Sequence, residues 1–128
     1  MTQANLPRIL LVEDDKINQM VAKINLEQLG YSLVDVANNG QEAIDMVAEN
    51  VYNLILMDVN MPFLNGCEAA RHIRQHEQQT NTRIPIIAMT ADIITNDCSE
   101  AGMDDVLEKP IAKDKLKQIL SKWLIANN

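Results

Sequence analysis

The sequence predicts an α/β fold of the (βα)5 type, in which helices wind doubly around a five-stranded parallel sheet. Short apolar runs alternate with amphipathic stretches along the chain, as five strands and five helices would require. The length of 128 residues suits a single domain, which we expect to span residues 1–128 with its core at about 7–126. Hydrophobic residues make up 47% of the sequence, with only one Trp, two Tyr and one Phe, so we expect an aliphatic core.

Five segments are predicted to be strands. Three of them are uninterrupted apolar runs with polar or turn residues on both sides: Ile9–Val12, Leu54–Met57 and Ile86–Met89. Such runs suit strands that are buried on both faces of a parallel sheet. Leu33–Ala37 contains a charged residue and is predicted to be an edge strand, and Val106–Leu107 is a weaker fifth candidate.

Five stretches between and after these strands have the periodicity of amphipathic helices. In the first, the apolar residues Ile17, Met20, Val21 and Ile24 recur at helical spacing, which predicts a stripe that packs on the core. The other four stripes are Ala43, Ile44, Val47 and Ala48; Ala69, Ala70 and Ile73; Ile94, Cys98 and Ala101; and Leu116, Ile119, Leu120, Trp123 and Leu124.

Composition excludes several classes of function. The formal net charge of −7 argues against direct binding to nucleic acid, because duplex affinity depends on Lys and Arg. The sequence has no membrane-spanning apolar run and no basic segment followed by an apolar one at its start, so we expect a soluble, cytoplasmic protein. Cys67 and Cys98 lie far apart in no C-x-x-C pair, and we expect both to be free thiols.

Polar residues follow four of the predicted strands. Glu13–Asp15 come after the first strand, Asp58 after the third, Thr90 after the fourth and Lys109 after the fifth. Each has a structural alternative: Asp15 and Thr90 are typical helix caps, and Lys109 could be a solvated surface residue. Ligands of doubly wound sheets bind at the carboxyl ends of the strands, so the convergence of these residues on one edge predicts a site there.

The chemistry of that site follows from its residue types. Carboxylates of Glu13, Asp14 and Asp58 would repel one another by about 4 kcal/mol per pair at 4 Å and an effective dielectric of about 20. Such a cluster needs a cation, or else some of its members must become protonated. Hard oxygen ligands of this kind suit Mg²⁺. Asp58 could then act as a nucleophile toward a phosphoryl group, with Lys109 and Thr90 stabilising the added oxygens.

The same segments resemble the receiver domains of two-component response regulators. The matching segments are Leu10–Asp15, Leu54–Pro62 with Gly66, Ala88–Ala91 and Glu108–Pro110. The resemblance covers nearly the whole chain and is strongest to receivers of hybrid sensor histidine kinases. It implies a CheY-like fold with the strand order 2-1-3-4-5, and no substrate turnover beyond self-catalysed phosphorylation and dephosphorylation.

The resemblance also implies a role for each site residue. Asp58 would accept the phosphoryl group from a phosphohistidine of a histidine kinase or a histidine-phosphotransfer domain. Mg²⁺, with Mn²⁺ as the alternative, would be bound by Asp14 and Asp58, by Glu13 through water, and by the backbone carbonyl of Asn60. Thr90, Ala91 and Lys109 would stabilise the phosphoryl group. The supporting residues would be Gly66, Asp92, Val106 and Pro110, the last after a cis bond.

Partner contacts would involve the polar face of the first helix and two loops. The expected docking residues are Asp15, Asn18 and Gln19, with Met61 and Phe63 from the loop Met61–Leu64, and Pro110 and Ile111. One residue departs from the family pattern, since Val106 stands where receivers usually carry an aromatic switch residue. We expect a monomer or a weak dimer, either as a stand-alone regulator or as part of a larger protein.

Three other functions are compatible with parts of the pattern. A haloacid-dehalogenase-type phosphatase would also use a carboxylate after an apolar strand, but it needs a second acid where Asn60 stands. A flavodoxin-like protein would need a phosphate-binding loop where Glu13 and Asp14 would repel phosphate. A degenerate receiver that serves only for docking is the third alternative, and the presence of Asp58, Thr90 and Lys109 gives it no support.

Overall fold

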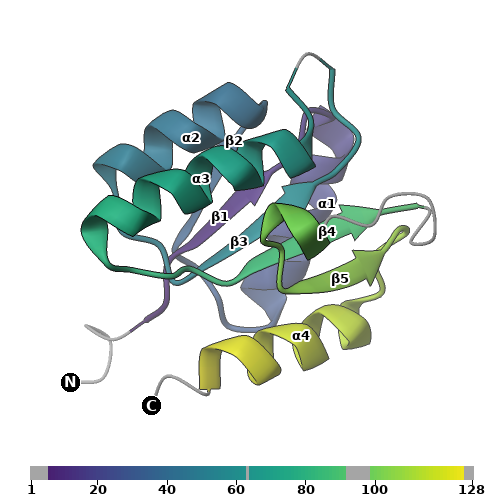
Figure 1. Cartoon of the computed structure of the whole chain (residues 1–128). Helices are drawn as coiled ribbons and strands as arrows, with labels where there is room; N and C mark the ends of the chain where they lie inside the picture. The colour runs from purple at the N-terminus through teal and green to yellow at the C-terminus, as the bar shows by residue number, and fades with distance from the viewer. Residues whose placement is uncertain (1–5, 63, 92–98, 126–128) are drawn as a thin grey trace.

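The computed structural model describes residues 6–62, 64–91 and 99–125. Its centre is a five-stranded parallel sheet with the order β2-β1-β3-β4-β5, as predicted (Figure 1). The strands are β1 (Ile9–Val12), β2 (Val34–Ala37), β3 (Leu54–Asp58), β4 (Ile86–Thr90) and β5 (Asp105–Glu108). The helices are α1 (Lys16–Gln28), α2 (Gly40–Glu49), α3 (Gly66–Thr80) and α4 (Lys113–Ile125), with a 3₁₀ helix η2 (Ser99–Ala101) before β5.

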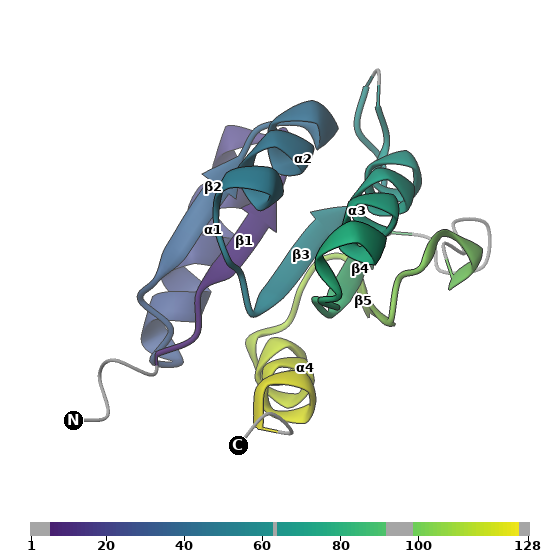
Figure 2. The ribbon, with the colours of Figure 1, turned by 60° about the vertical axis from the view of Figure 1, so that its left-hand side comes forward.

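The helices form two layers, with α2 and α3 on one face of the sheet and α1 and α4 on the other (Figures 1 and 2). Successive side chains of a strand point to opposite faces, so the inner strands contribute to two separate clusters. On β1, Leu10 and Val12 pack toward α2 and α3, while Ile9 and Leu11 pack toward α1 and α4. Both clusters are mainly aliphatic, as the composition predicted, with Tyr52 as a buried aromatic residue in the first.

The three uninterrupted apolar runs are strands buried at every residue, and β2 is a partly buried edge strand. The expected cap of α1 is also present, because the side chain of Asp15 accepts hydrogen bonds from the amides of Ile17 and Asn18. The bond between Lys109 and Pro110 is cis, as expected. None of the described helices is long and apolar enough to cross a membrane.

One prediction about a helix needs correction. The stripe Ile17, Met20, Val21 and Ile24 of α1 is not in the core, since these side chains are 45–71% exposed. The buried residues of α1 are instead Gln19 and Leu26. The helix expected around Ile94, Cys98 and Ala101 lies mostly outside the described residues, and its described end is the short 3₁₀ helix η2.

The prediction of two free thiols is wrong for Cys67. This residue follows Gly66 in the first turn of α3 and is disulfide-bonded. Among the described residues no cysteine is free. Cys98 lies outside the described residues.

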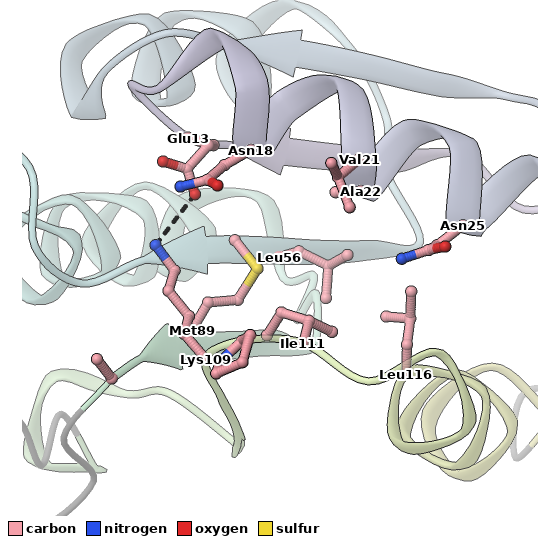
Figure 3. A pocket seen from close by; sticks show the side chains of 12 residues that line it. Glu13, Asn18, Val21, Ala22, Asn25, Leu56, Met89, Lys109, Ile111 and Leu116 are labelled. Carbon is pink, nitrogen blue, oxygen red and sulfur yellow. Dashed lines mark hydrogen bonds and ion pairs between the residues drawn. The ribbon is translucent and has the colours of Figure 1, made fainter.

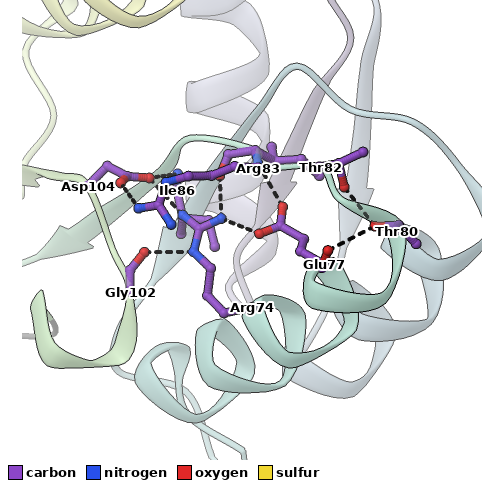
Figure 4. Close-up of polar contacts among 9 residues, drawn as sticks. Arg74, Glu77, Thr80, Thr82, Arg83, Ile86, Gly102 and Asp104 are labelled. Atoms are coloured by element: carbon purple, nitrogen blue, oxygen red, sulfur yellow. Dashed lines mark hydrogen bonds and ion pairs between the residues drawn. The ribbon is translucent and has the colours of Figure 1, made fainter.

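A polar cluster fixes the carboxyl half of α3 to the ends of the sheet opposite the predicted site (Figure 4). The guanidinium of Arg74 donates to the carbonyls of Gly102 and Ile84, at 2.9 and 2.8 Å. It also pairs with Glu77 at 2.6 Å and with Asp104 at 2.7 Å. This largely buried cation satisfies four oxygens at once and joins α3 to the segments before β4 and β5.

Candidate functional site

The carboxylates of Glu13, Asp14 and Asp58 meet at the carboxyl edge of the sheet. One ligand oxygen from each lies within 4.8 Å of the others. Glu13 and Asp14 follow β1 directly, and Asp58 is the last residue of the neighbouring β3. The prediction that the ends of these two strands bring three acids together is therefore confirmed.

Asp58 is held by a closely packed backbone. Asp58 is 2% exposed. The backbone amide of the following residue, Val59, donates to the carbonyl of Met89 on β4. The chain then returns against β3 at Gly66, whose amide donates to the carbonyl of Val59 at 3.1 Å. A Cβ atom at Gly66 would lie 2.4 Å from the carbonyl oxygen of Asp58, so this close return requires glycine.

Lys109 connects the carboxylates. Its Nζ lies 3.1 Å from Oδ1 of Asp58 and 3.1 Å from Oε1 of Glu13. Its backbone amide donates to the carbonyl of Thr90 at 2.7 Å, which fixes the end of β5 beside β4. The amide of Asn60 donates to Oδ1 of Asp58 at 3.1 Å, so two donors converge on the same carboxylate oxygen.

This arrangement changes the acidity of the central groups. Burial, together with the negative charge of Glu13, raises the pKa of Asp58 from 3.8 to about 6. Lys109 and the amide of Asn60 oppose that rise without cancelling it. Burial is the largest influence on Lys109 and works against its charge, but the combined attraction of Asp58 and Glu13 outweighs burial and holds the pKa of the lysine above its ordinary value.

The donor set fits a small divalent cation. Three carboxylates offer hard oxygen ligands, and a single lysine gives the cluster too little positive charge to balance them. Asp14 is exposed, whereas Glu13 and Asp58 are buried, so the cluster is open on one side. That combination suits Mg²⁺, which binds few carboxylates and keeps several waters.

The remaining predicted residues divide into three groups. Thr90 is fully buried at the end of β4, and Ala91 follows it at the surface. Val106 is partly buried on β5 and packs with the core on the α2 and α3 side. Asp92 and Phe63 lie outside the described residues.

The predicted docking surface is partly wrong. Asp15, Asn18 and Pro110 are exposed and Ile111 is half-buried, as an accessible surface requires. Gln19 and Met61 are 8% and 7% exposed, so neither side chain is accessible to a partner. Gln19 is turned inward because its amide bonds backbone and side-chain oxygens, and Met61 is packed in the core.

A cleft beside the acidic cluster was not predicted. It lies between α1 and α4, has a volume of about 380 Å³, and has Leu56 of β3 and Met89 of β4 as its floor (Figure 3). Val21 of α1 lines one wall, and Glu13 and Lys109 lie at one end. The sequence carries a signal for this surface, because the apolar stripe of α1 contains Val21, although the periodicity predicts that this stripe packs on the core.

The fold is a doubly wound parallel sheet, and a cluster of acids with one lysine lies at its carboxyl edge. These features define a class of small α/β domains that can bind a cation at a solvent-accessible acidic site. The chain belongs to the response regulator receiver domain family, whose model matches residues 9–121. This match selects the receiver over the phosphatase-type and flavin-binding alternatives.

Individual relatives agree with the family match. The chain is 40% identical to Histidine kinase 5 of Arabidopsis thaliana over 95% of its own length, but it spans only 16% of the length of that kinase. It is also 40% identical to the receiver domain of sensor histidine kinase PA1611 from Pseudomonas aeruginosa, with a TM-score of 0.84 and coverage of 92% of this chain and 97% of the other. That structure has a magnesium ion coordinated in its active site cleft.

A second solved structure contains a partner protein. It is the co-crystal structure of the histidine phosphotransfer signaling protein Ypd1 and the receiver domain of the response regulator Ssk1, both from Saccharomyces cerevisiae. The identity is 32% and the TM-score 0.84, with coverage of 92% of this chain and 90% of the other.

Proposed function

We propose that this receiver domain carries a phosphoryl group on Asp58, which it takes from a phosphohistidine of a partner protein. The observation that carries this proposal is the meeting of three carboxylates within 4.8 Å, with the Nζ of Lys109 3.1 Å from both Asp58 and Glu13. A buried aspartate at the edge of an open acidic cluster is suited to receive an anionic group once cations offset the local charge.

In the proposed transfer, a carboxylate oxygen of Asp58 attacks phosphorus. A P–O bond forms while the P–N bond to the imidazole breaks, and the imidazole nitrogen keeps the electron pair and takes a proton. With a pKa of about 6, Asp58 is mostly ionised at pH 7 and needs no base to activate it. Lys109 balances the charge of the new phosphoryl group, and the hydroxyl of Thr90 and the amide of Ala91 donate to its oxygens.

Mg²⁺, with Mn²⁺ as the alternative, would be held by Glu13, Asp14, Asp58 and the backbone carbonyl of Asn60. When bound, the cation offsets the charge of the carboxylates and of the incoming phosphoryl oxygens. The magnesium ion in the cleft of the PA1611 receiver supports this assignment. Gly66 and Pro110 would keep the loops around the site in place, and Asp92 would flank it.

Intact-mass spectrometry tests the proposal. Incubation with acetyl phosphate and Mg²⁺ should add one phosphate to the wild type and none to Asp58→Asn. A chelator should abolish labelling of the wild type. Labelling of Asp58→Asn to the wild-type level would refute Asp58 as the acceptor, and labelling that persists in the chelator would refute the need for a divalent cation.

We further propose that the partner is a histidine-phosphotransfer domain or a histidine kinase, and that it docks on the exposed apolar stripe of α1. Four large apolar side chains, Ile17, Met20, Val21 and Ile24, are 45–71% exposed there. Val21 also lines the cleft that ends at Glu13 and Lys109, so the stripe leads to the acidic cluster. The Ypd1 complex of the Ssk1 receiver supports this class of partner.

A charge placed on the stripe should separate docking from chemistry. We expect Ile17→Glu to slow transfer from a phosphorylated histidine-phosphotransfer protein at least tenfold and to leave labelling by acetyl phosphate unchanged. Val51→Glu is the matched control, because Val51 is 78% exposed and lies at the opposite end of the sheet, before β3. Equal transfer rates for the two variants would refute docking on α1.

The other proposals concern the protein as a whole. We propose a single domain over residues 1–128 that works in the cytoplasm as a monomer or weak dimer, binds no nucleic acid and turns over no separate substrate. The chain spans 11–16% of the first three curated relatives, all of them histidine kinases. Within a longer protein of that kind, the same domain would pass the phosphoryl group onward instead of acting alone.

A further inference from the structure

The side chain of Gln19 is buried beneath the turn that joins β1 to α1. Its Nε2 donates to the backbone carbonyl of Glu13 at 2.5 Å and to Oδ1 of Asn38 at 2.9 Å. Glu13 and Asp14 form this turn, and Asn38 follows the end of β2. One carboxamide therefore connects the acid-bearing turn to the neighbouring strand end.

The direction of these hydrogen bonds is set from α2. The carboxylate of Glu42 can only accept, and it receives the backbone amide of Asn38 at 2.8 Å and its Nδ2 at 3.0 Å. The Oδ1 of Asn38 must then point away from Glu42 and toward Gln19, and it also accepts a hydrogen bond from Nζ of Lys16 at 2.7 Å. Because Oδ1 of Asn38 is an acceptor, the Nε2 group of Gln19 must be the donor in this hydrogen bond. The same Nε2 group donates to the backbone carbonyl of Glu13.

Fixing this carbonyl fixes the peptide plane between Glu13 and Asp14, because a peptide unit is rigid. The other side of Glu13 is already held, since its amide donates to the carbonyl of Ala37 at 3.1 Å. Its side chain accepts from the amide of Asp15 at 3.2 Å. With the hydrogen bond from Gln19, both peptide groups of Glu13 are held, and this restrains the backbone from which Asp14 projects.

We propose that Gln19 is a positioning residue that holds the acid-bearing turn in the geometry required for cation binding. This inference rests on the proposed function, because the cation is the one assigned above to Glu13, Asp14 and Asp58. Two oxygens face Gln19, so the position requires a side chain with two N–H donors and no charge. A glutamate would present oxygen to oxygen, and a methionine would fill the same space without donating.

The test compares Gln19→Met with two controls. Gln41→Met makes the same change at an exposed residue of α2 whose side-chain amide donates to Asp45. Ile119→Ala removes apolar packing in α4, far from the turn, and controls for general loss of stability. Gln19→Asn is a second variant, for use if Gln19→Met does not fold. Its side chain is one methylene shorter, so its amide cannot reach both the carbonyl of Glu13 and Oδ1 of Asn38.

Two measurements are made on each folded variant well below its melting temperature. Hydrogen exchange of the amides of Asp14 and Asp15 is followed in metal-free protein, and the dissociation constant for Mg²⁺ is measured by calorimetry. Loss of an outer hydrogen bond to metal-binding residues typically weakens binding tenfold or more. We therefore expect at least tenfold weaker Mg²⁺ binding and at least tenfold faster exchange in the Gln19 variants, with both values within twofold of wild type in the controls.

The outcomes are distinguishable. If the Gln19 variants match Ile119→Ala in exchange and in Mg²⁺ affinity, Gln19 is only a packing residue and the inference is wrong. If the wild type itself binds no Mg²⁺, the proposed function fails, and the exchange rates alone then decide whether Gln19 orders the turn.

Discussion

Replacing Asp58 with asparagine should stabilise the metal-free protein at neutral pH, although it removes the proposed phosphoacceptor. The ionised carboxylate is buried and lies close to Glu13, and together these effects raise its pKa to about 6. Asparagine has nearly the same shape and carries no charge. The substitution therefore removes the cost of burying this charge and leaves the packing of β3 unchanged.

The magnitude follows from the shift in pKa. The unfolded chain should titrate near 3.8, so the folded state binds the proton of Asp58 about two pKa units more tightly. At 1.36 kcal/mol per unit, ionised Asp58 destabilises the fold by about 2 to 3 kcal/mol above pH 6. This penalty is fully present above the folded pKa and is lost as the pH falls from about 6 toward 4.

Urea denaturation of both proteins in EDTA, at several pH values between 4 and 8, measures this difference. We expect Asp58→Asn to be more stable by about 2 to 3 kcal/mol at pH 8 and by less than about 1 kcal/mol at pH 4. Comparing the two proteins at each pH largely cancels the titration of the other acids. Saturating Mg²⁺ should stabilise the wild type and reduce the gap at pH 8.

Two results would refute this reasoning. The first is an Asp58→Asn protein no more stable than the wild type at pH 8 without metal, which would mean that Lys109 fully neutralises the site. The second is a difference that grows on acidification, which has the wrong sign for a carboxyl group with a raised pKa.

Two further substitutions test contacts that stabilise the fold, one at the opposite end of the sheet and one beside the site. Arg74→Met should lower the free energy of unfolding by about 3 to 5 kcal/mol, because it removes the buried cation shared by Glu77 and Asp104 and leaves Asp104 paired with the exposed Arg83. A loss below about 1 kcal/mol by urea denaturation would contradict this. Gly66→Ala should cost about 2 to 3 kcal/mol and lower the yield of acetyl phosphate labelling, because its Cβ would collide with the carbonyl of Asp58. Wild-type stability in that variant would show that the loop can move aside.

The sheet and its order could be predicted because three strands carry their own signal. β1, β3 and β4 each contain a continuous apolar run, as a strand buried on both faces of a parallel sheet requires. β5 was predicted with less support, since only Leu107 of its four residues is fully buried. An edge strand keeps polar residues that weaken the pattern.

The acidic cluster could be predicted for a topological reason. Parallel strands place their carboxyl ends on one edge, so Glu13, Asp58 and Lys109 converge although they are far apart in sequence. The role of Gln19 could not be predicted, because one of its acceptors is a backbone carbonyl and the other, Asn38, lies 19 residues away. The amino-acid sequence does not reveal which backbone carbonyl lacks a hydrogen-bond donor from the backbone.

The orientation of α1 shows why periodicity alone can select the wrong face of a helix. The stripe of Ile17, Met20, Val21 and Ile24 is more apolar than the face that packs on the sheet, which contains Gln19 and Leu26. Burying a large aliphatic side chain contributes about 1.5 to 3 kcal/mol, so leaving four of them exposed forgoes substantial stability.

That forgone burial would become available if the proposed partner covered the stripe. Turning α1 to bury the stripe would expose Gln19 and release the carbonyl of Glu13, and with it the turn that carries Asp14. The hydrogen bonds of one buried carboxamide are thus consistent with a single helix serving both purposes. Its inner face orders the acidic cluster, and its outer face stays free for the protein that would deliver the phosphoryl group.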